Sequence, residues 1–160
     1  MEAYFDNSAT TRVTDSVKDI VVKTMTEDYG NPSSMHMVGV EAEKYIKTAK
    51  ENIAKILKVD EKEIYFTSGG TEGNNLAIVG VVEANKRSGN KIITTEIEHA
   101  SVASPMKYLE KEGYNVVYLP VDRYGVVDME FLKKEMSEDT ILVSVMHVNN
   151  EVGAIEPVGE

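Results

Sequence analysis

The stretch Ser68-Gly69-Gly70-Thr71 is well suited to hold a charged ligand, because it ends an apolar run and opens a helical segment. The first turn of a helix has unpaired backbone N–H groups and the positive end of the helix dipole, and both favour an anion. Glycines let the backbone approach a ligand, and the hydroxyls of Ser68 and Thr71 add donors. The plainer interpretation is a tight turn in which Thr71 caps the helix. No P-loop or G-x-G-x-x-G pattern is present, which excludes those nucleotide sites.

Two further apolar runs are followed by polar side chains with possible chemistry. His99 lies in EIEHAS, where an imidazole can stack on a planar ligand or move protons near neutral pH. Asn149 and Asn150 follow the third run, and their amides can donate to a ligand oxygen. The plainer interpretations are a half-exposed loop histidine and ordinary turn residues. His147 is predicted to be a core residue inside a strand, and His36 lies near the start of a long helix.

Hydrophobic spacing predicts the elements that position these residues. Segments with strand character are residues 64–67, 91–95, 115–119 and 140–148. Helical segments between them are residues 72–87, 101–112 and 128–136, the last capped by Asp128. The alternation is typical of an α/β fold, a three-layer sandwich with a mostly parallel sheet flanked by helices. Ligands of such sheets bind beyond the carboxyl ends of the strands.

Residues 1–60 are predicted to form an N-terminal helical segment that packs near the active site. One helix follows Thr14 or Asp15, and a longer amphipathic helix runs from about Val38 to Leu57. Residues 61–160 are expected to be the first part of a large α/β domain, with the chain ending in mid-domain.

Composition excludes several classes of function. The net charge is −10, with 27 acidic and 17 basic residues, and no basic stripe offers a nucleic-acid interface. No apolar run approaches the roughly 20 residues of a membrane span, and no signal peptide is evident, so a soluble, cytoplasmic protein is expected. Cysteine is absent, which removes disulfides, thiolate metal sites and a cysteine nucleophile from these residues. No metal site is predicted.

The three polar signals are predicted to meet at one edge of the sheet. A phosphate seat, a ring-stacking histidine and an amide directed at a ring substituent together indicate a site for a phosphorylated aromatic cofactor.

Five motifs resemble those of the cysteine desulfurases, which are pyridoxal-phosphate enzymes of the class V aminotransferase fold. They are FDNSATT, YGNPSSMH, IYFTSGGTEGNN, IITTEIEHASV and MHVNNEVGAIEP. The resemblance is to the N-terminal portion of the NifS/IscS-like group, which serves nitrogenase and general iron–sulfur assembly. It implies that Gly70 and Thr71 hold the phosphate of pyridoxal 5'-phosphate. It also implies that His99 is catalytic and stacks on the pyridine ring, and that Asn150 bonds the phenolic oxygen.

The resemblance further implies a substrate pocket at Asn7, Ala9 and Thr10. The reaction removes sulfur from L-cysteine, leaving alanine and an enzyme persulfide, and passes the sulfur to an iron–sulfur scaffold or another acceptor. The complete enzyme is expected to be a homodimer.

The family's Schiff-base lysine and its catalytic cysteine lie beyond the matched region. A missing C-terminal half or a second chain would supply them, so these residues alone are expected to be inactive and to bind the cofactor without a covalent lysine linkage. The alternatives are a non-catalytic module that keeps the fold as a structural or partner-binding domain, and another class V enzyme such as a selenocysteine lyase.

Overall fold

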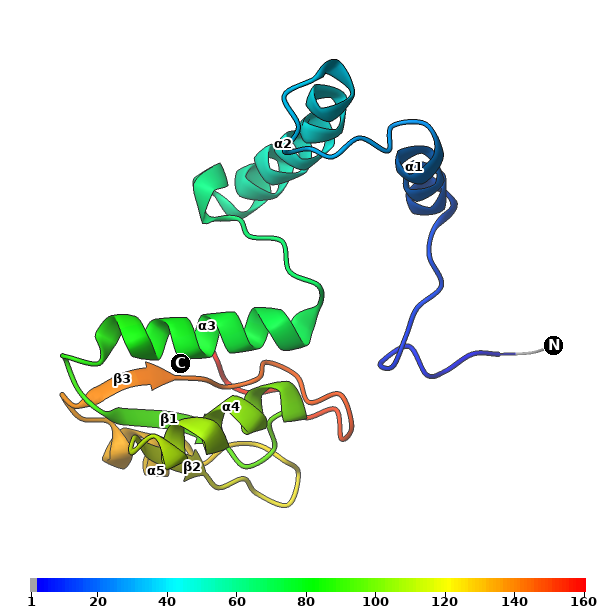
Figure 1. The fold of residues 1–160 in the computed structure, drawn as a ribbon. Coiled ribbons are helices and arrows are strands. Elements are labelled where there is room, and N and C mark those ends of the chain that lie inside the picture. The colour runs from blue at the N-terminus through cyan, green and yellow to red at the C-terminus, as the bar shows by residue number, and fades with distance from the viewer. Residues whose placement is uncertain (1–2) are drawn as a thin grey trace. The chain divides into compact units, whose positions relative to one another are not determined.

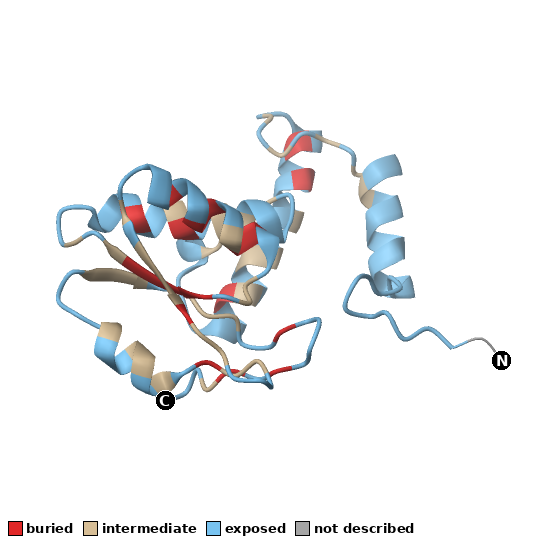
Figure 2. Ribbon diagram, turned by 90° about the horizontal axis from the view of Figure 1, so that it is seen from below, coloured by how far each residue is buried: buried red, intermediate tan, exposed pale blue. Residues whose placement is uncertain are grey.

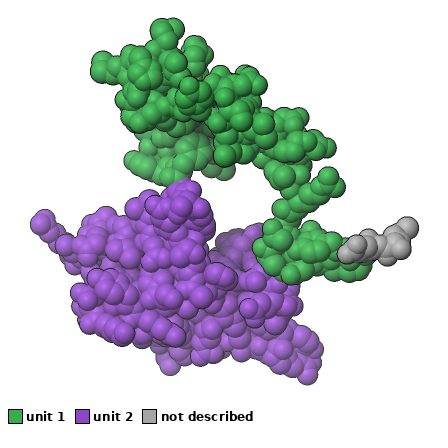
Figure 3. All heavy atoms as spheres, turned by 45° about the vertical axis from the view of Figure 1, so that its right-hand side comes forward, with its two compact units in different colours: residues 1–66 green, residues 67–160 purple. Residues whose placement is uncertain are grey.

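The computed structural model describes residues 3–160, which fall into two compact units divided between Phe66 and Thr67 (Figure 3). The first unit is helical, and the second contains a parallel sheet with helices. No helix within residues 3–160 is both long and apolar enough to cross a membrane.

The first unit contains the two helices that the hydrophobic spacing predicts. Helix α1 spans Asp15–Thr26, α2 spans Met37–Leu57, and a short 3-10 helix, η1, spans Glu61–Glu63. His36 is the N-cap of α2, where its Nδ1 accepts the backbone N–H of Gly39 at 3.3 Å. Helix α1 contains no buried residue, so its apolar side chains are largely exposed within this unit (Figure 2).

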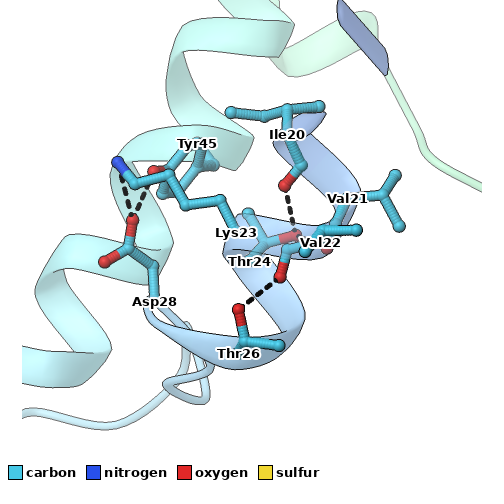
Figure 4. A network of polar contacts seen from close by, with 8 residues as sticks. All are labelled: Ile20, Val21, Val22, Lys23, Thr24, Thr26, Asp28 and Tyr45. Carbon is cyan, nitrogen blue, oxygen red and sulfur yellow. Dashed lines mark hydrogen bonds and ion pairs between the residues drawn. The ribbon is translucent and has the colours of Figure 1, made fainter. Parts of the chain in front are cut away.

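A small polar network joins the end of α1 to α2 (Figure 4). Asp28 pairs with Lys23 Nζ at 3.2 Å and accepts a short hydrogen bond from the Tyr45 hydroxyl. These partners lower the pKa of Asp28, the Tyr45 hydrogen bond most and the Lys23 bond next. The hydroxyls of Thr24 and Thr26 donate hydrogen bonds to backbone carbonyls of the preceding turn of α1.

The second unit is built on a three-stranded parallel sheet of order β2-β1-β3 (Figure 1). The strands are β1 Lys91–Thr95, β2 Asn115–Leu119 and β3 Thr140–Val143. The helices are α3 Gly70–Asn85, α4 Ala100–Lys111 and α5 Met129–Glu135. The Asp128 side chain caps α5 by accepting the Phe131 N–H at 2.9 Å, as predicted.

The core of this unit lies where α3 and α4 pack against each other and on one face of the sheet. Its buried side chains are Ile78, Val82, Ile92, Val102, Met106 and Leu109. On β1 the neighbouring Ile93 is also fully buried, so this central strand is covered on both faces. The α/β fold with a parallel sheet, predicted from the hydrophobic spacing, is therefore confirmed.

Two predicted strand segments differ in the structure. Residues 64–67 form no strand, because residues 64–66 belong to the helical unit, which offers no strand in its described part to pair with. The third strand ends at Val143 instead of residue 148. His147 is exposed and lies outside the strand, so its prediction as a core residue is wrong.

Candidate functional site

The start of α3 is the first part of the site. The helix begins at Gly70, with Gly69 as N-cap, so Thr71 lies in the first turn and is not the cap. A Cβ on Gly69 or Gly70 would meet no atom within 4 Å, so the space beside this helix start is open. Thr71 is exposed, and the first-turn N–H groups have no carbonyl partner within the helix. These donors suit an anion.

Glu72 contributes a negative charge beside these donors. Its carboxylate accepts the backbone N–H of Ser68 at 2.6 Å. Hydrogen bonds from the Ser68 hydroxyl, and then from its backbone N–H, lower the pKa of Glu72. The carboxylate thus fixes the loop before α3 and leaves the N–H groups of Gly70 and Thr71 to other acceptors.

His99 is the N-cap of α4 and follows directly on the loop after β1. Its Nδ1 accepts the backbone N–H of Ser101 at 3.1 Å and lies 2.9 Å from the Ser101 hydroxyl. Asn74 on α3 donates to the same hydroxyl oxygen at 2.8 Å. The imidazole is exposed, so its free edge and faces are available to a ligand. These bonds hold the starts of α3 and α4 together.

Asn149 and Asn150 follow β3 and behave differently from each other. Asn149 is buried, and its Oδ1 accepts the N–H groups of Glu151 and Val152 at 2.8 and 2.9 Å. The turn interpretation therefore holds for Asn149. Its Nδ2 also donates to the carbonyl of Ile97 at 3.1 Å, which ties this turn to the loop that carries His99. Asn150 is exposed, and its side chain makes no hydrogen bond within residues 3–160.

Glu98 makes a second tie between the same two segments. Its Oε1 accepts the backbone N–H of Met146 at 2.7 Å and the Thr95 hydroxyl at 3.2 Å. The bond to Glu98 removes the Met146 N–H from the hydrogen-bond ladder of the sheet, which accounts for the early end of β3. Burial raises the pKa of Glu98, and the nearby Glu156 carboxylate adds to the increase. The two hydrogen bonds act in the opposite direction.

The raised pKa of Glu98 predicts a pH-dependent stability. A carboxyl group whose pKa is higher in the folded than in the unfolded protein stabilises the folded state. The full contribution is present at pH values below the unfolded pKa. That contribution is lost as the pH rises through the folded pKa. Glu98→Gln keeps an acceptor oxygen but cannot ionise. Relative to this variant, the wild type is expected to lose stability as the pH rises above the ordinary glutamate pKa of 4.5. Urea unfolding midpoints at several pH values measure it, and a difference that stays constant would contradict it.

The structure brings together three of the predicted parts of the site. The start of α3, the loop at His99 and the turn at Asn150 are joined by hydrogen bonds at the carboxyl end of β1. Only two of them follow strands, and the third is a helix start held alongside by Asn74. The predicted substrate residues are exposed and belong to the other unit: Asn7, Ala9 and Thr10. No group of three or more metal-binding side chains occurs within residues 3–160.

Sequence reasoning missed three residues that make these connections, and for Asn149 it missed the bond to Ile97. Asn74, Glu98, Ser101 and Asn149 are polar, and each is buried or half-buried. The available signal was their position inside the motifs TEGNN, EIEHAS and VNNE. Buried polar side chains are normally hydrogen-bonded, but a sequence does not show with which partner.

Known proteins are similar to the chain over its whole described length. Residues 3–160 match the family model described as aminotransferase class-V. The cysteine desulfurase IscS 1 of Archaeoglobus fulgidus is 46% identical over 157 residues, covering 98% of this chain and 41% of that protein. The cysteine desulfurase IscS of Dictyoglomus turgidum is 48% identical over 159 residues, covering 99% of this chain and 40% of that protein.

Solved structures agree with these matches. A structure described as a NifS-like protein has a TM-score of 0.93 and 49% identity, covering 99% of this chain and 43% of that chain. A structure described as SspA in complex with cysteine has a TM-score of 0.88 and 34% identity, covering 97% of this chain and 45% of that chain. The chain therefore spans about 40% of the length of the curated relatives it matches. The match over residues 3–160 shows that the chain belongs to the aminotransferase class-V family.

Proposed function

We propose that this chain forms the N-terminal, cofactor-binding portion of a pyridoxal-phosphate-dependent cysteine desulfurase. The observation that carries the proposal is that hydrogen bonds connect the start of α3, the His99 loop and the turn that contains Asn150. The names of two relatives support the same chemistry, since the proteins of Archaeoglobus fulgidus and Dictyoglomus turgidum are described as cysteine desulfurases.

The residues present fit pyridoxal phosphate. The phosphate requires several donors, and the first turn of α3 offers free N–H groups, the Thr71 hydroxyl and open space beside Gly70. The aromatic ring requires a flat partner, which the exposed His99 imidazole supplies. A ring oxygen requires a donor, and the Asn150 amide is exposed and makes no hydrogen bond within residues 3–160. When bound, this cofactor stabilises negative charge that develops on an amino acid's carbon atoms.

Each of these residues has a separate task in the proposed site. Thr71 and the α3 N–H groups anchor the ligand by its charge, at the positive end of a helix dipole. His99 holds the ring face and presents a nitrogen that can exchange hydrogen bonds with a reacting group. Asn150 orients the ring from a turn that Asn149 stabilises. Rigid positioning of this kind contributes to catalysis by reducing the freedom of the reactants.

The substrate and partners are proposed from the relatives. L-cysteine is the proposed substrate, and one similar structure is described as a complex with cysteine. The sulfur would pass to an iron–sulfur scaffold or a similar acceptor, in a homodimeric, cytoplasmic enzyme. The residues Asn7, Ala9 and Thr10 are proposed to line the substrate pocket. The lysine that bonds the cofactor and the cysteine that receives the sulfur are proposed to come from residues outside this chain, which contains no cysteine.

Borohydride treatment of the isolated chain tests the proposal. We expect pyridoxal phosphate to bind reversibly at one site, with an absorbance change that dialysis reverses. Borohydride fixes a covalent lysine linkage irreversibly, and mass spectrometry should find no single lysine labelled. Stoichiometric labelling of one lysine would show that the chain carries its own linkage site. Absence of binding would instead favour a structural module.

Thr71→Ala is expected to weaken binding of pyridoxal phosphate to the chain by about 1–2 kcal/mol. The reason is the loss of one hydrogen bond to a charged group at a helix start. Titration followed by absorbance measures the affinities. Thr71→Ser keeps the hydroxyl and serves as the matched control, with binding near that of the wild type. Equal affinities for wild type and Thr71→Ala would mean that this turn does not hold the phosphate.

A further inference from the structure

A row of hydrogen bonds runs from α3 to the ring of His99. Asn74 Nδ2 donates to Ser101 Oγ at 2.8 Å, and Ser101 Oγ lies 2.9 Å from His99 Nδ1. The backbone N–H of Ser101 donates to the same Nδ1 at 3.1 Å. Ser101 is 7% exposed, so water does not readily replace these partners.

The donor and acceptor roles in this row follow from the chemistry of each group. An amide nitrogen only donates, so Ser101 Oγ accepts from Asn74 and keeps its own proton for a different acceptor. The backbone N–H of Ser101 also only donates, so His99 Nδ1 faces it with a lone pair. Ser101 Oγ lies 2.9 Å from that lone pair and accepts from Asn74, so its own proton can be donated to His99 Nδ1. In the neutral ring of His99 the proton therefore lies on Nε2.

We infer that Ser101 and Asn74 are positioning residues, which hold the His99 ring at the start of α4 with its proton on Nε2. The inference rests on the proposed function, in which His99 meets the cofactor ring. A neutral ring held in this way presents an N–H donor to the ligand and has no lone pair at Nε2 to take up a proton. The row also couples two cofactor contacts, because Asn74 lies one turn along α3 from Thr71.

Asn74→Asp reverses the row with almost no change in side-chain size. A carboxylate only accepts, so the Ser101 hydroxyl would donate its hydrogen bond to the new carboxylate and no longer to His99 Nδ1. Nitrogen-15 NMR of the cofactor-free chain at about pH 9, above the usual ionisation range of imidazole, reads the position of the ring proton. We expect the Nε2–H form in the wild type, and in Asn74→Asp a changed chemical shift of Nδ1, because that nitrogen keeps the backbone N–H of Ser101 but loses the hydroxyl donor. Asn85→Asp, whose amide bonds only the Val81 carbonyl at the far end of α3, should leave the ring unchanged.

Ser101→Ala tests the same row through binding. Loss of one hydrogen bond that orients the ring is expected to weaken pyridoxal phosphate binding by about two- to tenfold. Ser101→Thr, which keeps the hydroxyl, should restore most of the affinity. Ser104→Ala changes an exposed serine of the same helix and should have no effect.

Identical ring nitrogen shifts in the wild type and a folded Asn74→Asp chain would overturn the inference. Equal binding by wild type and Ser101→Ala would also contradict it. If the wild type bound no pyridoxal phosphate, the proposed function would fail. The ring measurement needs no cofactor, so it would still decide the positioning role.

Discussion

Met106→Ala is expected to lower the free energy of unfolding of the α/β unit by about 2–5 kcal/mol. Met106 is 0% exposed and packs in the buried cluster between α3, α4 and the sheet. Alanine removes most of the buried side chain, and the surrounding residues close only part of the resulting cavity. Urea denaturation followed by circular dichroism measures the loss as a lower midpoint with an unchanged slope.

Met136→Ala is the matched control for this prediction. Met136 follows α5 and is 49% exposed, so the same substitution removes little buried surface there. We expect a change of less than about 0.5 kcal/mol, as for most surface substitutions. Similar losses in the two variants would show that the cluster at Met106 is not the centre of the core.

Strands β1 and β2 were predictable because their apolar residues are bounded by turn residues on both sides. Residues 91–95 and 115–119 are strands in the structure as predicted. Residues 64–67 have the same apolar character, yet a strand also requires a neighbour to complete its hydrogen bonds. Tyr65 is 73% exposed and Phe66 54%, so hydrophobic composition alone did not determine their structure.

The end of β3 shows a second limit of sequence reasoning. The apolar run continues to residue 148, but the Met146 N–H bonds the Glu98 carboxylate. A contact between residues so far apart in the sequence leaves no local pattern. The same holds for the row from Asn74 through Ser101 to His99. The motifs identified which residues could meet a ligand, and long-range side-chain bonds determine how those residues are held.

In the whole enzyme of the proposed function, His99→Ala is expected to lower kcat/KM for L-cysteine by about 10²–10⁴-fold. The substitution removes both the flat partner of the cofactor ring and a positioned nitrogen beside the reacting group. It also removes the N-cap of α4, which by itself costs about 1 kcal/mol of stability. Steady-state measurement of alanine and sulfide release gives the change in rate.

Two control variants separate the chemistry of the His99 ring from its capping role. His99→Asn keeps an N-cap side chain without an imidazole, so it should retain the stability of α4 and still lose the rate. His36→Ala removes a histidine that caps α2 in the same manner, and it should lose stability of a similar size with little change in rate. If His99→Asn were as active as the wild type, His99 would serve only as a helix cap, because asparagine replaces that function and supplies no imidazole.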